Sequence, residues 1–218
     1  MNRIITIGRE FGSGGRELGR RLSERLGLAY YDQEIIEEIA EQTSLSKEYV
    51  KTIVEKRPVF SYPIHTARTL YPQTNPVMEQ NLEIYSKQHQ IIKDLAEESE
   101  CVIVGRCADY ILRDMEPFRI FVFADIESRM QRTREKSYGD DEVKGLSDKD
   151  LKRSIERIDR GRAKYYEFYT GQKWGARLNY DILVNTTGIH LEAVAEHVAA
   201  LFGSCRDPYK EESINKIS

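Results

Sequence analysis

The sequence predicts an α/β protein with a mostly parallel sheet, and two observations carry that prediction. Short apolar runs rich in β-branched and aromatic residues alternate with longer segments of helical pattern, and the first run leads directly into a glycine-rich turn and a helix. Because parallel strands need a crossover between them, this alternation is typical of βαβ units. Strands are predicted at residues 3–7, 29–31, 101–104, 119–123 and 181–184.

The segments between these runs have helical periodicity and recognisable ends. Leu18, Leu22 and Leu26 recur every four residues and Gly27 follows them as a stop signal, while Ser46 and Ser147 stand where N-caps are expected. Helices are therefore predicted at residues 16–26, 32–41, 46–56, 76–98, 108–114, 125–134, 147–169 and 191–202.

Composition indicates one domain over residues 1–202, followed by a polar tail at 203–218. The 218 residues suffice for a sizeable core, and 33 basic against 36 acidic residues give a net charge of -3, which favours neither nucleic acid nor a membrane as partner. The first apolar run is too short for a signal peptide or a membrane span, so we expect a cytoplasmic protein. Three cysteines without metal-ligand spacing favour reduced thiols over a disulfide scaffold or a zinc site.

Two further stretches stand out from the alternating pattern. Prolines concentrate at residues 57–76, which predicts a loop or connection there. Residues 129–164 hold twelve Lys and Arg against eight Asp and Glu, with Ser137-Tyr138-Gly139-Asp140 and Lys144-Gly145 interrupting the helical pattern. A solvated helix pair and a phosphate-contacting lid both fit this basic stretch.

The turn after the first strand reads Gly8-Arg9-Glu10-Phe11-Gly12-Ser13-Gly14-Gly15-Arg16-Glu17. Three glycines within four residues allow a tight turn that aims several backbone N–H groups at one point, and the start of a helix adds the positive end of its dipole. Such a concavity favours phosphate. A merely tight strand-to-helix connection would need fewer glycines.

Two phosphate-binding templates fit the turn. As Gly8-x-x-x-Gly12-x-Gly14 it matches the dinucleotide turn of short-chain dehydrogenases, with Asp32 available for the ribose hydroxyls. As a P-loop, G-x-x-x-x-G-K-[ST], it has Arg9 in place of the first glycine, Gly15 in place of the lysine and Arg16 in place of the hydroxyl residue. The cradle is then kept, and Arg16 or Arg9 can supply the missing positive charge.

The turn, the following Tyr30-Tyr31-Asp32 and the run Val102-Ile103-Val104-Gly105-Arg106-x-Ala108-Asp109-Tyr110 together resemble the cytidylate kinase-like family, a divergent branch of the nucleoside monophosphate kinases. The resemblance covers nearly the whole chain. It implies a P-loop NTPase-type, three-layer α/β/α fold with a five-stranded parallel sheet. It also implies an acceptor-binding insertion at about residues 33–99 and an arginine-bearing helical lid at about residues 135–165.

The resemblance also implies roles for particular residues. The donor phosphates would be bound by Gly12, Ser13, Gly14, Gly15, Arg16 and Glu17, the acceptor by Asp32, Arg106, Asp109 and Asp159, and the catalytic charges would come from Arg16, Arg157, Arg160 and Arg162. Family members carry an aspartate where Cys107 stands, and an Asp-Ser-Gly where Asp32 is followed by Gln33 and Glu34. The sequence therefore leaves the acceptor open.

The activity expected is transfer of the γ-phosphoryl group of ATP, with Mg²⁺, to a nucleoside monophosphate or a similar small acceptor. No residue is assigned to the metal ion. A non-catalytic nucleotide-binding protein and an NAD(P)-dependent dehydrogenase are the alternatives. The aromatic cluster Tyr165, Tyr166, Phe168, Tyr169 and Trp174 is expected to pack a helix against the core or a second subunit, so a homodimer is a further expectation.

Overall fold

The computed structural model describes residues 3–55, 76–136 and 145–204. Five parallel strands form one sheet in the order β2-β3-β1-β4-β5. The strands are β1 (Ile4–Arg9), β2 (Ala29–Tyr31), β3 (Cys101–Val104), β4 (Phe118–Phe123) and β5 (Ile182–Asn185). The strand that leads into the glycine turn is therefore central, flanked by β3 and β4.

Alternate residues of the central strands pack on opposite faces of the sheet, as the two-residue period of a strand requires. On β3, Cys101 and Ile103 belong to one buried cluster, while Val102 and Val104 belong to the other. All four are fully buried, which explains why β3 is a continuous apolar run in the sequence.

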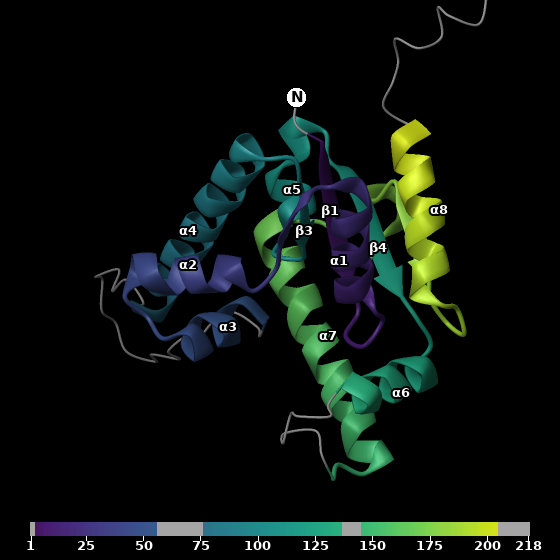
Figure 1. Cartoon of the computed structure of the whole chain (residues 1–218). Helices are drawn as coiled ribbons and strands as arrows, with labels where there is room; N and C mark the ends of the chain where they lie inside the picture. Colours follow the sequence, from purple (N-terminus) through teal and green to yellow (C-terminus); the bar gives the residue numbers. More distant parts are fainter. Residues whose placement is uncertain (1–2, 56–75, 137–144, 205–218) are drawn as a thin grey trace, which may run out of the picture.

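Helices cover both faces of the sheet and make a three-layer α/β/α structure (Figure 1). The helices are α1 (Gly15–Leu26), α2 (Glu34–Thr43), α3 (Lys47–Glu55), α4 (Pro76–Glu98), α5 (Ala108–Ile111), α6 (Ile126–Lys136), α7 (Asp148–Thr170) and α8 (Leu191–Ser204), with 3₁₀ turns η1 (Arg113–Met115) and η2 (Arg177–Asn179). One face packs against α1 and α8, and the other against α2, α3, α4, α5 and α7. The 23-residue α7 runs past the glycine turn toward α6 (Figure 1).

The structure confirms the predicted fold class and every predicted strand and helix in the described ranges, with most ends within two residues. One exception is the predicted helix at 108–114, which is wrong beyond Ile111, where the chain continues as the 3₁₀ turn η1. The sequence also missed η2. The proline-rich stretch 57–75, the interruption at 137–144 and the tail from residue 205, with Cys205, lie outside the described residues.

The strand order excludes the dinucleotide-binding alternative. In that fold the first two strands are neighbours, in the order 3-2-1-4-5-6. Here β1 pairs with β3 and β4, and β2 lies beyond β3. Across residues 3–55, 76–136 and 145–204, no helix has the length and apolar content that a membrane crossing requires.

Candidate phosphate-transfer site

The glycine turn leaves no room for side chains at its key positions. Gly12 and Gly14 have φ of 76° and 87°, a conformation that disfavours residues with a Cβ. A Cβ on Gly12 would lie 2.7 Å from the Arg129 carbonyl oxygen, and one on Gly14 would lie 2.7 Å from Leu191 Cδ1. Because α1 begins at Gly15, its first N–H groups lack intrahelical acceptors and face this turn. The result is a cradle suited to phosphate.

A largely buried arginine and two partly buried carboxylates hold the first half of the turn. Arg129 of α6 donates from Nε to the Phe11 carbonyl oxygen at 2.7 Å and from Nη1 to Glu10 Oε2 at 3.0 Å. Its Nη2 donates to Asp159 of α7, whose other carboxylate oxygen accepts the Phe11 N–H at 2.8 Å. Both polar groups of the Phe11 backbone are thus fixed by side chains from two helices.

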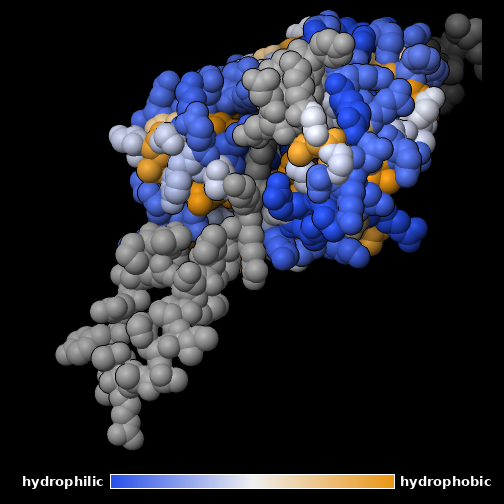
Figure 2. All heavy atoms as spheres, turned by 90° about the horizontal axis from the view of Figure 1, so that it is seen from below, coloured by the Kyte–Doolittle hydropathy of each residue, from blue (hydrophilic) through white to orange (hydrophobic). Residues whose placement is uncertain are grey.

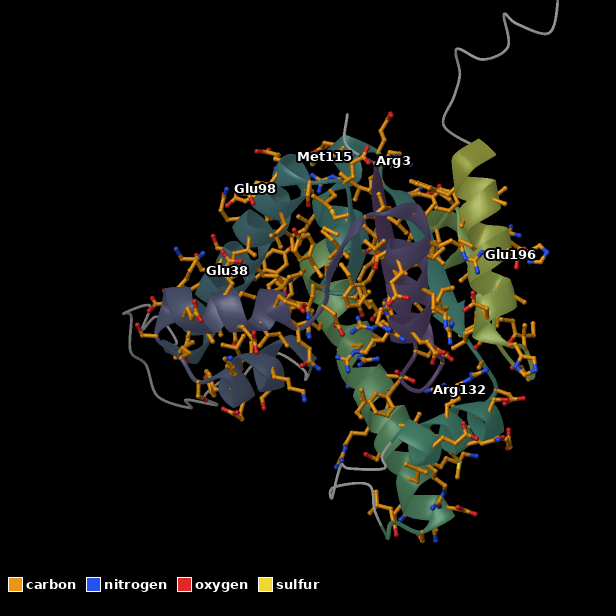
Figure 3. All side chains as sticks on the ribbon, in the orientation of Figure 1. Arg3, Glu38, Glu98, Met115, Arg132 and Glu196 are labelled. Carbon is orange, nitrogen blue, oxygen red and sulfur yellow. The ribbon has the colours of Figure 1, made fainter. Side chains whose placement is uncertain are left out.

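A second arginine of α6 holds the other half of the turn. Arg132, labelled in Figure 3, donates from Nη1 to Thr186 Oγ1 at 3.1 Å and from Nη2 to the Thr186 carbonyl oxygen. The Thr186 hydroxyl in turn donates to the Ser13 carbonyl oxygen at 2.7 Å. The turn is therefore clamped between α6 and the segment that follows β5.

Arginines gather around one buried carboxylate at the carboxyl ends of β1, β2 and β3. Asp32 accepts Arg16 Nε at 2.6 Å and lies 3.4 Å from Arg9 Nη2. Arg162 of α7 donates to the Arg9 carbonyl oxygen at 3.4 Å and lies over the Phe11 ring, 5.5 Å from its centre. Burial, then the charge of Arg162, lowers the pKa of Arg9 to about 9, so Arg9 remains a cation at neutral pH.

The Gly-Arg segment after β3 has an unusual backbone. Gly105, Arg106 and Cys107 have φ of 79°, 60° and 56° in succession. The two non-glycine residues carry strain of a kind that concentrates at functional sites. Gln88 of α4 stabilises this turn by donating to the Arg106 carbonyl oxygen at 2.9 Å. The turn buries Arg106, whose exposed fraction is 7%.

Asp109 lies in the same region as a buried carboxyl group. It accepts a hydrogen bond from the Tyr166 hydroxyl at 2.7 Å. Burial raises the pKa of Asp109, and the hydrogen bond from Tyr166 opposes that rise only in part. Arg9, Arg106, Asp109 and Arg162 all line one pocket, whose aromatic wall is formed by Tyr165, Tyr166, Trp174 and Tyr180.

The structure brings some of the predicted site residues together and places others apart. Arg16 and Asp32 pair with each other beside Arg9. Arg106, Asp109 and Arg162 line one pocket together with Arg9. The Asp159 carboxylate accepts the Phe11 N–H of the glycine turn, and its contact with the acceptor stays a prediction. Arg157 and Arg160 have exposed side chains on α7, where they contact Ser154 and Glu156. The Glu17 carboxylate accepts hydrogen bonds from Nε and Nη2 of Arg21, one helical turn further along α1.

Sequence reasoning missed Arg129 and Arg132 as supports of the turn. Their partners Phe11 and Thr186 are 118 and 54 positions away along the chain, so no local pattern reveals them. For Arg162, which was among the predicted residues, helical periodicity gives a weak signal of its orientation. On α7 it is seven residues from Ile155 and four from Tyr166, both buried, so helical periodicity puts it on the inward face.

The carboxylates near the turn do not fit a protein-held Mg²⁺ site. Glu10 and Asp159 are paired with Arg129, and Asp32 is paired with Arg9 and Arg16. Within the described ranges, no group of three or more His, Cys, Asp or Glu side chains is arranged to bind a metal ion. We assign no residue to Mg²⁺.

The described surface on the side where the strands end is mostly polar. The view from below, toward the carboxyl ends of the strands, shows mostly hydrophilic residues with scattered apolar ones (Figure 2).

Comparison with known proteins identifies relatives over most of the chain. The sequence model of the cytidylate kinase-like family matches residues 4–188. A curated relative, cytidylate kinase of Methanopyrus kandleri (strain AV19), is 24% identical over 194 residues, which cover 84% of each chain.

Solved structures show the same fold. An uncharacterized protein from Eubacterium ventriosum ATCC 27560 aligns with a TM-score of 0.67 and 24% identity, covering 93% of this chain and 99% of the other. Shikimate kinase from Bacteroides thetaiotaomicron aligns with a TM-score of 0.56 and 14% identity over 92% and 98% of the two chains. Shikimate kinase from Acinetobacter baumannii, in complex with shikimate, aligns with a TM-score of 0.53 and 17% identity, covering 94% of this chain and 95% of the other.

Proposed function

Because the chain belongs to the cytidylate kinase-like family, we propose that it transfers the γ-phosphoryl group of ATP to a nucleoside monophosphate or a similar small anionic acceptor. The observation that carries the proposal is the pairing of a glycine cradle at the start of α1 with the arginines around Asp32. Phosphoryl transfer needs little covalent chemistry from the protein, and relies on positioning and charge neutralisation. The cradle and the arginines supply these two requirements.

In this proposal the backbone N–H groups of residues 12–16 bind the donor phosphates. Arg16 lies at the mouth of the cradle, with 43% of its side chain exposed, and is free to exchange Asp32 for a phosphate oxygen. Arg162 closes over the turn from α7 and adds positive charge where the transferred group carries negative charge. Arg157 and Arg160 remain predictions for a closed lid.

Arg106 binds the acceptor anion in this proposal, since its buried guanidinium lines the pocket next to the cradle. Asp32 holds Arg9 and Arg16 in position, and Asp109 shapes the pocket through Tyr166. For Asp159 we propose a supporting role under the turn.

The proposal is tested by following ATP consumption by purified protein with Mg²⁺ and with CMP, other nucleoside monophosphates or shikimate as acceptor. Arg106→Met should raise the KM for the acceptor and leave the affinity for ATP unchanged. Arg113→Met is the matched control, because Arg113 lies outside the pocket lining, is half exposed and is stacked over Tyr110. Equal kinetics in the Arg106 and Arg113 variants would contradict the assignment of Arg106.

A non-catalytic nucleotide-binding protein is the second candidate, and Gly15 at the lysine position favours it. ATP binding without consumption, whichever acceptor is added, would support that candidate over the phosphotransferase.

A further inference from the structure

We propose that positions 9 and 15 have exchanged roles, so that Arg9 supplies the cation that a P-loop lysine would supply from position 15. The proposal rests on the proposed function and names the side chain that contacts the donor phosphates from the floor of the site. In the P-loop template the first glycine coincides with Arg9 and the lysine with Gly15. Both arrangements combine one glycine with one cation, in opposite order.

The two positions share one space. A Cβ on Gly15 would lie 2.5 Å from Arg9 Cβ and 3.0 Å from Arg9 Cγ. Real Cβ atoms do not approach other carbons so closely, and Arg9 Cβ is attached directly to the backbone of β1. Only one of the two positions can therefore carry a side chain. A lysine at 15 requires glycine at 9, and Arg9 requires glycine at 15.

The path of Arg9 supports its function as a fixed cation. Its side chain crosses from β1 to the end of β3, where a Cβ on Gly105 would lie 1.6 Å from Arg9 Nη1. Gly105 therefore makes room for the guanidinium, as Gly15 makes room for the stem. Asp32 anchors the far end at 3.4 Å, and Arg9 and Arg106 line the same pocket.

The surrounding charges favour an anion beside Arg9. Its guanidinium is close enough to those of Arg16, Arg106 and Arg162 for all three to lower its pKa, against the single opposing charge of Asp32. Asp32 is itself shared with Arg16. Phosphate oxygens would offset this excess of positive charge, because guanidinium groups bind them through paired hydrogen bonds.

Arg9 and Arg16 differ in exposure, which suits them to different tasks in this proposal. The Arg9 side chain is 8% exposed and that of Arg16 is 43% exposed. A buried cation fixed at both ends is preorganised, and needs no rearrangement when the substrate arrives. Arg16 is the adjustable partner at the mouth of the site.

The exchange is tested with Arg9→Gly, Gly15→Lys and the double variant, by calorimetric titration with Mg·ATP. Each single variant should raise the Kd for ATP, Arg9→Gly by roughly 10- to 100-fold, as expected for a lost hydrogen-bonded charge. The double variant should return to within about threefold of the wild type, since it restores the template's glycine and lysine. Arg20→Ala, at an exposed arginine of α1 that pairs with Glu24, should bind ATP like the wild type.

Arg9→Met provides a variant that keeps the aliphatic stem if Arg9→Gly fails to fold, and the same loss of affinity is expected. Gly15→Ala tests the shared space by itself. It should lower the midpoint of urea unfolding when Arg9 is present, and should not lower it in the Arg9→Gly background.

The outcomes separate this proposal from the proposed function. Wild-type protein that binds no ATP contradicts both. Tight ATP binding by Arg9→Met, or a folded double variant no better than Arg9→Gly, overturns the exchange and leaves the phosphotransferase intact. An unchanged unfolding midpoint in Gly15→Ala would contradict the claim that Arg9 and a side chain at position 15 compete for the same space.

Discussion

Arg129→Met should destabilise the protein strongly through the glycine turn. The Arg129 side chain is 9% exposed, and its partner carboxylates on Glu10 and Asp159 are 27% and 14% exposed. Methionine removes the bonds to Phe11, Glu10 and Asp159. Glu10 then loses its cation, and Asp159 keeps only Arg162, whose Nη1 lies 3.9 Å from its Oδ1. Removing one partner of a buried ion pair costs about 3–5 kcal/mol. At about 2–4 °C per kcal/mol for a chain of this size, Tm should fall by about 6–20 °C.

The assay is urea unfolding at neutral pH, with Arg134→Met as the matched control. Arg134 is also on α6, but it and its partner Asp148 are 45% and 82% exposed, so its loss should cost less than about 1 kcal/mol. Arg129→Met/Asp159→Asn should cost less than the sum of its two single changes, because the second change removes a stranded charge.

The pH dependence adds a second readout for Arg129. Burial raises the pKa of both Glu10 and Asp159, and Arg129 opposes that rise. Without Arg129 the two carboxyl groups should take up protons more readily, so the stability deficit of Arg129→Met should shrink as pH falls. A free energy of unfolding within about 0.5 kcal/mol of the wild type would refute the argument, since that is the range of ordinary surface substitutions.

Three further changes test separate parts of the site. Arg16→Ala should lower turnover more than stability, because Arg16 is half exposed; unchanged turnover would remove it from the mechanism. Gly12→Ala should abolish ATP binding, because the added Cβ has no room in the turn. Gly27 also has a positive φ, of 67°, but an added Cβ there would have nothing within 4 Å. Gly27→Ala should therefore lower the free energy of unfolding by about 1–2 kcal/mol and leave ATP binding intact. Asp109→Asn should stabilise the protein at neutral pH, because it removes a charge whose burial is unfavourable. This gain should shrink as pH falls through the raised pKa of Asp109 toward 3.8, because the folded protein binds the proton more tightly than the unfolded chain does. A gain in stability that does not change with pH would contradict the burial of the charged form.

The central strands β1, β3 and β4 were predictable because burial on both faces leaves a strong signal in the sequence. The predicted range of β3, whose four residues are all buried, agrees with the structure at both ends. The end of the helix at Ile111 was harder to predict, since Leu112, Arg113 and Asp114 are compatible with a helix and only the geometry of the turn into β4 ends it.

The site was predictable where function follows from local sequence, and not where it depends on tertiary contacts. The cradle at Gly12 and Gly14 follows from the order of residues after β1. The hydrogen bond between the Asp159 carboxylate and the Phe11 N–H, 148 positions earlier, depends on tertiary structure and has no signal in the local sequence. The crowding between Arg9 and Gly15 was equally invisible, because it depends on how the turn folds back over β1.

The most direct test of the phosphate cradle is an amide ¹H–¹⁵N titration of the labelled protein with Mg·ATP. The largest shifts are expected at the backbone amides of Gly12, Gly14 and Gly15, whose N–H groups would bind the donor phosphates, with smaller changes around Arg9. Saturable ATP binding that leaves these amides unmoved, with the main shifts elsewhere, would contradict the account.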